Sequence, residues 1–123
     1  MKKKVLIVDD EESTVQLIEF ILEKGNLIPI LAHSGVKALE KAREERPDLI
    51  LLDIMMPGMD GLEVCEEIKK DHHLKEIPIL FLTALGQETD VERGLKLGAH
   101  GYIIKPFNPS DLLHQINLIL SSK

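Results

Sequence analysis

Acidic, hydroxyl and amine side chains follow several short apolar segments of this chain, where they could act together chemically. The residues that follow four of these segments are Asp9 with Asp10, Asp53, Thr83, and Lys105. Clustered carboxylates are poor at filling a core, but they suit the binding of a hard divalent cation such as Mg²⁺. A carboxylate beside such a cation can also act as a nucleophile toward phosphorus. These residues therefore form a candidate site for phosphoryl chemistry.

Five short apolar runs have the character of buried strands: residues 5–8, 27–31, 49–52, 77–82 and 102–104. Between and after them lie segments with helical periodicity, so strand and helix alternate five times. This alternation predicts successive βα units with right-handed crossovers, and hence a doubly wound parallel α/β sheet covered by helices. The carboxyl ends of parallel strands share one edge, which would bring the candidate residues together.

Helix faces and ends are predicted from the same pattern. We expect the second helix to bury Val36, Leu39 and Ala42, and the fourth helix, residues 87–97, to bury Val91 and Leu95. Ser34 can cap the second helix. The fourth helix contains a glycine and has only a thin apolar stripe, so we expect it to be the most mobile.

Charge repulsion gives the acidic cluster a chemical requirement. Two carboxylates about 4 Å apart repel by roughly 4 kcal/mol at an effective dielectric near 20, so three need a cation. Mg²⁺ held by Asp10 and Asp53, with Asp9 acting through a bound water, would meet that need. Thr83 and Lys105 would then bind phosphoryl oxygens. The alternative for Asp9 or Asp10 is a structural one, capping a helix that starts near residue 12 or 13.

Four sequence motifs carry a resemblance to a known family. They are VDDE at residues 8–11, LLDIMMPGMDG at 51–61, LTA at 82–84 and GYIIKPF at 101–107. Together they resemble the receiver domain of bacterial response regulators, and the resemblance covers the whole chain. It implies a CheY-like, flavodoxin-like (βα)5 fold with sheet order 2-1-3-4-5, and a single receiver domain over residues 1–123.

The resemblance also implies roles for the site residues. Asp53 would be the phosphate acceptor; Asp10, Asp53 and the backbone carbonyl of Met55 would be the direct Mg²⁺ ligands, and Asp9 would assist. The peptide bond between Lys105 and Pro106 looks like the family's cis bond.

A switch is implied as well. The Thr83 hydroxyl would move to the new phosphoryl group and Tyr102 would fill the space it leaves, repacking the face formed by helix 4, strand 5 and helix 5. The donor would be a histidine kinase or a histidine phosphotransfer protein, and the output would be binding of a downstream protein. The family's lifetime-tuning positions, Met55 and Leu85, are apolar here, so we expect slow autodephosphorylation and no other enzymatic activity.

Composition excludes several classes. The 123 residues carry a formal charge of −6, which disfavours direct nucleic-acid binding. No apolar run approaches the roughly 20 residues of a membrane span, and the run after Lys2 to Lys4 is too short for a signal peptide, so we expect a cytoplasmic protein. The single cysteine, Cys65, is expected to pack in a helix, and the histidines show no metal-ligand spacing.

Other functions stay open on the sequence. An aspartate-nucleophile phosphohydrolase would generally need a cap domain, and a flavin-binding protein would need a phosphate-binding loop where Asp9 and Asp10 stand. The chain could also be the excised receiver of a longer DNA-binding or enzymatic regulator. Relatives of that kind usually dimerise through an acidic pair where this chain has His100 and Gly101, so we expect a monomer, with a weak dimer left open.

Overall fold

The computed structural model describes residues 2–122, in which five strands and five helices alternate. The strands are β1 (Lys4–Val8), β2 (Ile28–Ala32), β3 (Leu49–Asp53), β4 (Ile79–Ala84) and β5 (Gly101–Lys105). The helices are α1 (Glu12–Lys24), α2 (Gly35–Glu45), α3 (Gly61–Lys70), α4 (Glu88–Lys96) and α5 (Pro109–Ser121). All strand pairs are parallel and the sheet order is β2-β1-β3-β4-β5, which confirms the predicted fold.

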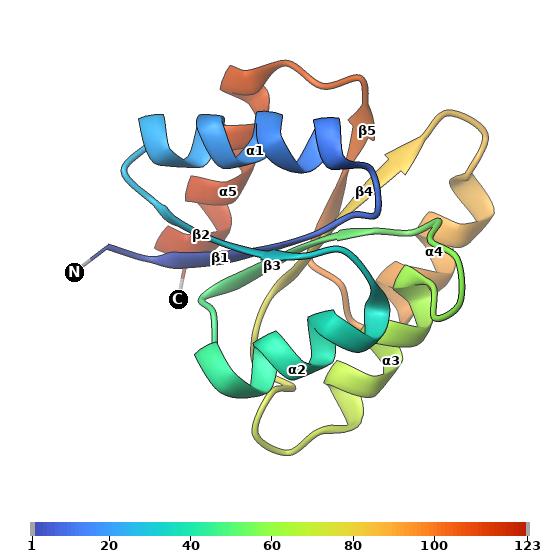
Figure 1. The fold of residues 1–123 in the computed structure, drawn as a ribbon. Helices are drawn as coiled ribbons and strands as arrows, with labels where there is room; N and C mark the ends of the chain where they lie inside the picture. Colours follow the sequence, from blue (N-terminus) through green and yellow to red (C-terminus); the bar gives the residue numbers. More distant parts are fainter. Residues whose placement is uncertain (1, 123) are drawn as a thin grey trace.

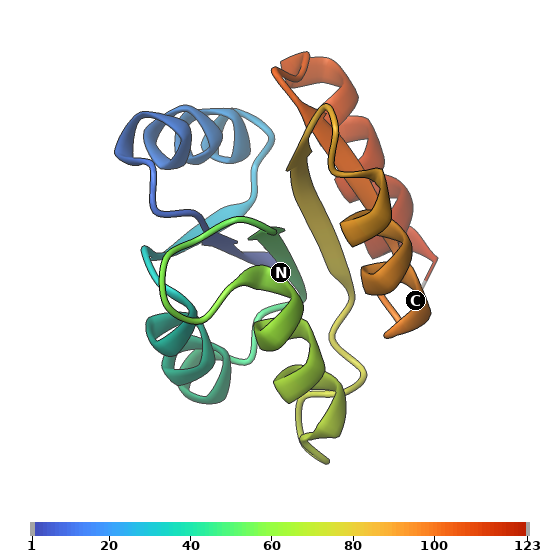
Figure 2. The ribbon, with the colours of Figure 1, turned by 90° about the vertical axis from the view of Figure 1, so that its right-hand side faces the viewer.

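The sheet lies between two helical layers (Figures 1 and 2). Helices α1 and α5 cover one face, and α2, α3 and α4 cover the other. Each layer has its own apolar core, one centred on Ile18, Leu51 and Ile116, and the other on Leu52, Ile68 and Phe81. The central strand β3 is buried along its whole length, which explains why its sequence reads as a continuous apolar run.

Two strands begin later than the apolar runs indicated. Leu27 belongs to the turn after α1, because its N–H donates to the Leu22 carbonyl at 2.9 Å, and β2 starts at Ile28. Ile77 likewise closes a turn on Leu74 at 3.0 Å, and β4 starts at Ile79. The apolar side chains at these ends pack outside the ladder, so apolarity alone could not mark the start of each strand.

Three candidate site residues also lie inside strands rather than after them. Asp53 and Lys105 are the last residues of β3 and β5, and Thr83 is the penultimate residue of β4. Their polar side chains stand at the carboxyl ends of the strands, so the ladder includes them.

The predicted buried stripes were wrong at one position in each of two helices. Val36 is 58% exposed, because α2 instead buries Ala38 along with Leu39 and Ala42. Leu95 is 41% exposed, since α4 buries Val91 and Gly94. The predicted cap of α2 is confirmed: the Ser34 hydroxyl accepts a hydrogen bond from the Lys37 N–H at 3.2 Å.

Gly94 allows α4 to approach the sheet closely. A Cβ added there would lie 2.2 Å from Cε2 of the Phe81 ring, which is fully buried. The glycine that weakens the helix in isolation is thus the residue that lets α4 pack closely against Phe81 of β4. Whether α4 is the most mobile helix stays a prediction.

Cys65 is buried in α3, and burial raises the pKa of its thiol to about 11, which fits a packing role.

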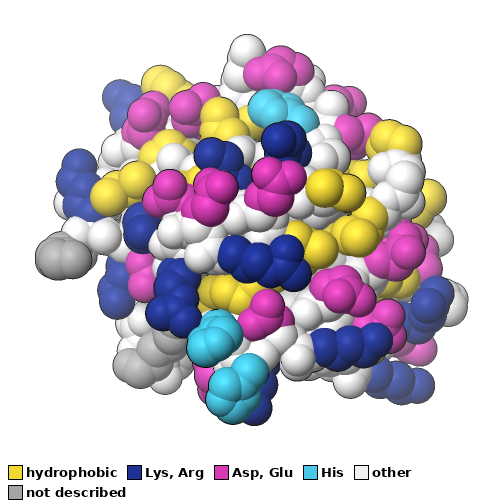
Figure 3. Space-filling view, turned by 60° about the horizontal axis from the view of Figure 1, so that its bottom comes forward, with side chains coloured by type: hydrophobic (Ala, Val, Ile, Leu, Met, Phe, Trp, Pro, Cys, Tyr) yellow, Lys and Arg dark blue, Asp and Glu magenta, His cyan; other side chains and the backbone are white. Residues whose placement is uncertain are grey.

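Within residues 2–122, no helix is both long enough and apolar enough to cross a membrane. The face shown in Figure 3 mixes acidic and basic side chains, and so offers no uniformly basic surface to a nucleic-acid backbone.

The contact between α4 and Phe81 gives a stability prediction. Replacing Gly94 with Ala improves helix propensity by about 1 kcal/mol, but inserting a methyl group against a buried ring costs about 1 to 3 kcal/mol. We expect the G94A variant to lose about 1 kcal/mol of unfolding free energy in urea titrations. Thr89→Ala, on the exposed side of α4, is the control and should be no less stable than the unchanged chain. A G94A variant as stable as the T89A control would contradict this packing.

Candidate functional site

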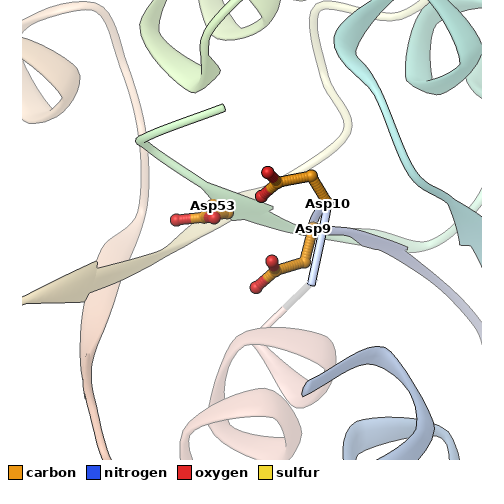
Figure 4. Close-up of side chains that lie close together, drawn as sticks. All are labelled: Asp9, Asp10 and Asp53. Carbon is orange, nitrogen blue, oxygen red and sulfur yellow. The ribbon is translucent and has the colours of Figure 1, made fainter. Parts of the chain in front are cut away.

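Three carboxylates meet at the carboxyl edge of the sheet. Val8 pairs with Leu52 in register, so Asp9, which follows β1, and Asp53, which ends β3, lie side by side. One carboxylate oxygen from each of Asp9, Asp10 and Asp53 lies within 4.8 Å of the others. Figure 4 shows the three side chains extending to the same side of the strand ends. Asp9 and Asp53 are buried and Asp10 is exposed, so the cluster opens to solvent on one side.

Local backbone contacts hold two of these carboxylates. Asp9 Oδ1 accepts a hydrogen bond from the Glu11 N–H at 3.0 Å, and Asp53 Oδ1 accepts one from the Met55 N–H at 3.3 Å. The N-cap residue of α1 is Glu11, and it makes no side-chain capping bond. The alternative interpretation of Asp9 or Asp10 as a helix cap is therefore wrong.

Gly61 keeps the loop after β3 close to the site. Its N–H donates to the Ile54 carbonyl at 2.8 Å, and a Cβ at this position would lie 2.2 Å from the Asp53 carbonyl oxygen. Any larger residue would push α3 away from the end of β3. The glycine thus lets the segment from Asp53 to Gly61 turn back against the strand.

Lys105 brings a positive charge to the cluster. Its Nζ lies 2.9 Å from Asp9 Oδ2 and 3.6 Å from Asp53 Oδ2, so the amine pairs more closely with Asp9 than with Asp53. The peptide bond between Lys105 and Pro106 is cis. Burial lowers the pKa of Lys105, but the hydrogen bond to Asp9 and the charges of Asp53 and Asp9 outweigh burial and raise it, so this amine stays charged.

Among the three carboxyl groups of the cluster, Asp53 has a raised pKa. Burial, followed by the charge of Asp9, raises the pKa of Asp53 to about 7, against the opposing effects of Lys105 and the Met55 N–H. One ammonium therefore does not offset the negative charge gathered here. A hard dication with oxygen ligands would do so, and the clustered carboxylates are the ligand type that Mg²⁺ takes. The residues present thus fit a Mg²⁺ site.

Thr83 is buried and its side chain is bonded away from the acidic cluster. Its hydroxyl lies 2.7 Å from Gln87 Oε1, and the Ala84 N–H donates to the same oxygen at 2.7 Å. Sequence reasoning missed Gln87. The available signal was a polar residue four positions after Thr83, immediately before α4.

Tyr102 lies on β5 opposite Phe81 and is 46% exposed. It lines a hollow of about 280 Å³ together with Thr83, Gln87 and Leu95. The two residues assigned to the switch therefore border one space between α4 and β5. Met55 and Leu85 are both exposed at the loops that follow β3 and β4.

The raised pKa of Asp53 predicts a pH-dependent stability. A carboxyl whose pKa rises on folding favours the folded state below about pH 4, and this contribution is lost as the pH rises through about 7. Asn resembles the protonated acid, so in EDTA the Asp53→Asn variant should be more stable than the unchanged chain at pH 8, by about 1 kcal/mol or more. Urea titrations at several pH values should show this difference shrinking toward pH 4.

Asp111→Asn, on the exposed first turn of α5, is the matched control and should change the unfolding free energy by less than about 0.5 kcal/mol. An equal difference between D53N and the unchanged chain at pH 4 and pH 8 would contradict the assigned electrostatics.

Sequence comparisons show which family of proteins this chain is related to. The family model of the response regulator receiver domain matches residues 5–117. The chain is 46% identical over 120 residues to the alkaline phosphatase synthesis transcriptional regulatory protein PhoP of Bacillus subtilis, covering 98% of this chain and 49% of that protein. It thus spans about half the length of the curated relatives it matches.

Solved structures of response regulators have the same fold as this chain. A putative response regulator from Chloroflexus aurantiacus superposes with a TM-score of 0.94 at 32% identity, covering 98% of this chain and 99% of that one. The chemotaxis protein CheY4 of Vibrio cholerae gives a TM-score of 0.91 at 34% identity, covering 97% and 99%. The chain belongs to the response regulator receiver domain family of two-component systems.

Proposed function

We propose that this chain is a single receiver domain that takes a phosphoryl group onto Asp53 from a phosphohistidine of a kinase or a phosphotransfer protein, with Mg²⁺ bound at the acidic cluster. The observation that carries the proposal is the convergence of Asp9, Asp10 and Asp53 with the Lys105 amine. Aspartate is an established covalent nucleophile toward phosphorus.

The transfer exchanges one bond to phosphorus for another. An oxygen of the Asp53 carboxylate bonds to phosphorus while the bond from phosphorus to the donor imidazole nitrogen breaks; the imidazole leaves with the electron pair. Asp10, Asp53 and the Met55 carbonyl would hold Mg²⁺ directly, and Asp9 would assist. The bound metal supplies positive charge to the phosphoryl oxygens. Lys105 would bind one of those oxygens. Because its amine already donates to Asp9, it would then bond to Asp9 and to the phosphoryl group together.

The output follows from a second set of contacts. The Thr83 hydroxyl would turn to the phosphoryl group, and Tyr102 would move into the hollow that both residues border. The face of α4, β5 and α5 would then change shape and bind a downstream protein. Such a shift requires phosphoryl contacts that differ between the two conformations. We propose that the domain acts as a cytoplasmic monomer and makes no direct contact with nucleic acid.

A second candidate for the output is favoured by the relatives. PhoP of Bacillus subtilis and ycf27 of Guillardia theta, both about twice the length of this chain, are named as a transcriptional regulator and a probable one. In that case the changed face would act on a DNA-binding domain of the same polypeptide.

A phosphohydrolase would instead turn over a chromogenic phosphate monoester, which a receiver should not do.

Phosphorylation from a small donor tests the proposal. Incubation with acetyl phosphate and Mg²⁺ should add one phosphoryl mass, and peptide mapping should place it on Asp53. The D53N variant and the EDTA-treated protein should stay unmodified, because one lacks the nucleophile and the other the charge-compensating metal. An unmodified protein in the presence of Mg²⁺, or a label on another residue, would contradict the proposal.

The lifetime of the acyl phosphate gives a further prediction. Met55 and Leu85 have no polar group with which to orient an attacking water, so the phosphoprotein should lose its label slowly. Met55→Asn combined with Leu85→Glu should shorten the half-life several-fold, followed by intact-mass measurements after donor removal. Leu17→Asn, an exposed leucine on α1, is the control and should leave it unchanged. An unaltered half-life in the double variant would refute the role of these two positions.

A further inference from the structure

The Thr83 hydroxyl donates its proton in a hydrogen bond to the side chain of Gln87. The two oxygens, Thr83 Oγ1 and Gln87 Oε1, are 2.7 Å apart, which is a short and well-formed hydrogen bond. The next acceptor, the Ala84 carbonyl, lies farther away at 3.3 Å. Because Thr83 is only 1% exposed, water does not readily replace this partner.

The Ala84 backbone fixes which end of the Gln87 amide faces Thr83. The Ala84 N–H can only donate, and it lies 2.7 Å from the same side-chain atom of Gln87. That atom must therefore be the amide oxygen, because an NH₂ group there would oppose the N–H. Toward an oxygen that cannot donate, the Thr83 hydroxyl must itself be the donor.

A threonine hydroxyl has a single proton. If Thr83 is to donate to a phosphoryl oxygen on Asp53, the bond to Gln87 has to break first. On the basis of the function proposed above, we propose that Gln87 is a positioning residue that holds Thr83 in the unphosphorylated arrangement and so weakens the binding of a phosphoryl group at Asp53.

The position of Gln87 also connects this bond to α4. Gln87 precedes the first residue of α4, and its carbonyl accepts from the Val91 N–H at 3.0 Å in the first turn. Its side chain closes the loop that contains Gly86, whose φ is +94°. Thr83 is therefore bonded to the same side-chain oxygen that closes the loop where α4 begins, beside the hollow that Tyr102 lines.

A double-mutant cycle tests the proposal with beryllofluoride, a phosphoryl mimic, and Mg²⁺. Its Kd is measured for the unchanged chain, Gln87→Leu, Thr83→Val and the double variant. Loss of one net hydrogen bond corresponds to about fivefold in affinity, so Q87L should bind the mimic about fivefold more tightly. In the T83V background, where there is no hydroxyl to release, the same change should have less than about a twofold effect.

Gln87→Glu checks the direction of the effect. A carboxylate keeps the acceptor for both Ala84 and Thr83 and makes the bond to the hydroxyl stronger. The Q87E variant should therefore bind the mimic more weakly. The added negative charge acts equally in the T83V background, so the part of the loss that appears only with Thr83 present belongs to the hydrogen bond.

Gln16→Leu, an exposed glutamine on α1, is the matched control and should leave the Kd unchanged. If the unchanged chain shows no binding that depends on Mg²⁺ and Asp53, the proposed function fails. If that binding is present but Q87L does not tighten it, or tightens it equally in the T83V background, the proposed function stands and the role of Gln87 is refuted.

Discussion

An imbalance of charge at the carboxyl edge of the sheet constrains the chemistry of this protein. Three aspartates gather there against the single amine of Lys105, and two of the three are buried. Burial removes water that would screen their repulsion, so ionising all three carboxylates raises the free energy of the folded state. Burial, followed by the charge of Asp9, raises the pKa of Asp53 to about 7, and a bound cation would favour the ionised, nucleophilic carboxylate.

The parallel topology creates that imbalance. Strands β1 and β3 are neighbours in the sheet, so the residues at their ends come together although they are far apart in the chain. Strand β4, next to β3, carries Thr83 toward the same edge, and its hydroxyl is held by Gln87 at the start of α4. A single edge of the sheet thus joins the acidic cluster to the helix whose face is proposed to respond.

Much of this was predictable from sequence, because strand ends that carry polar residues are visible as interruptions of apolar runs. The alternation of elements and the parallel sheet follow from it, whereas the strand order that places Asp9 beside Asp53 was implied by the resemblance to receiver domains. The buried faces of α2 and α4 were less predictable, since Val36 and Leu95 are apolar but exposed, while Gly94 is buried only because the Phe81 ring lies against it. The preference of Lys105 for Asp9, and the bond from Thr83 to Gln87, depend on loop conformations that no periodicity encodes.

Thermal unfolding tests directly whether this cluster needs a divalent cation, as proposed. Adding Mg²⁺ should raise the melting temperature strongly at pH 8, where Asp53 is ionised, and much less at pH 5, where protons compete for the same carboxylate. A sodium salt added at the same ionic strength should change the melting temperature little. A melting temperature at pH 8 that does not respond to Mg²⁺ would contradict the account.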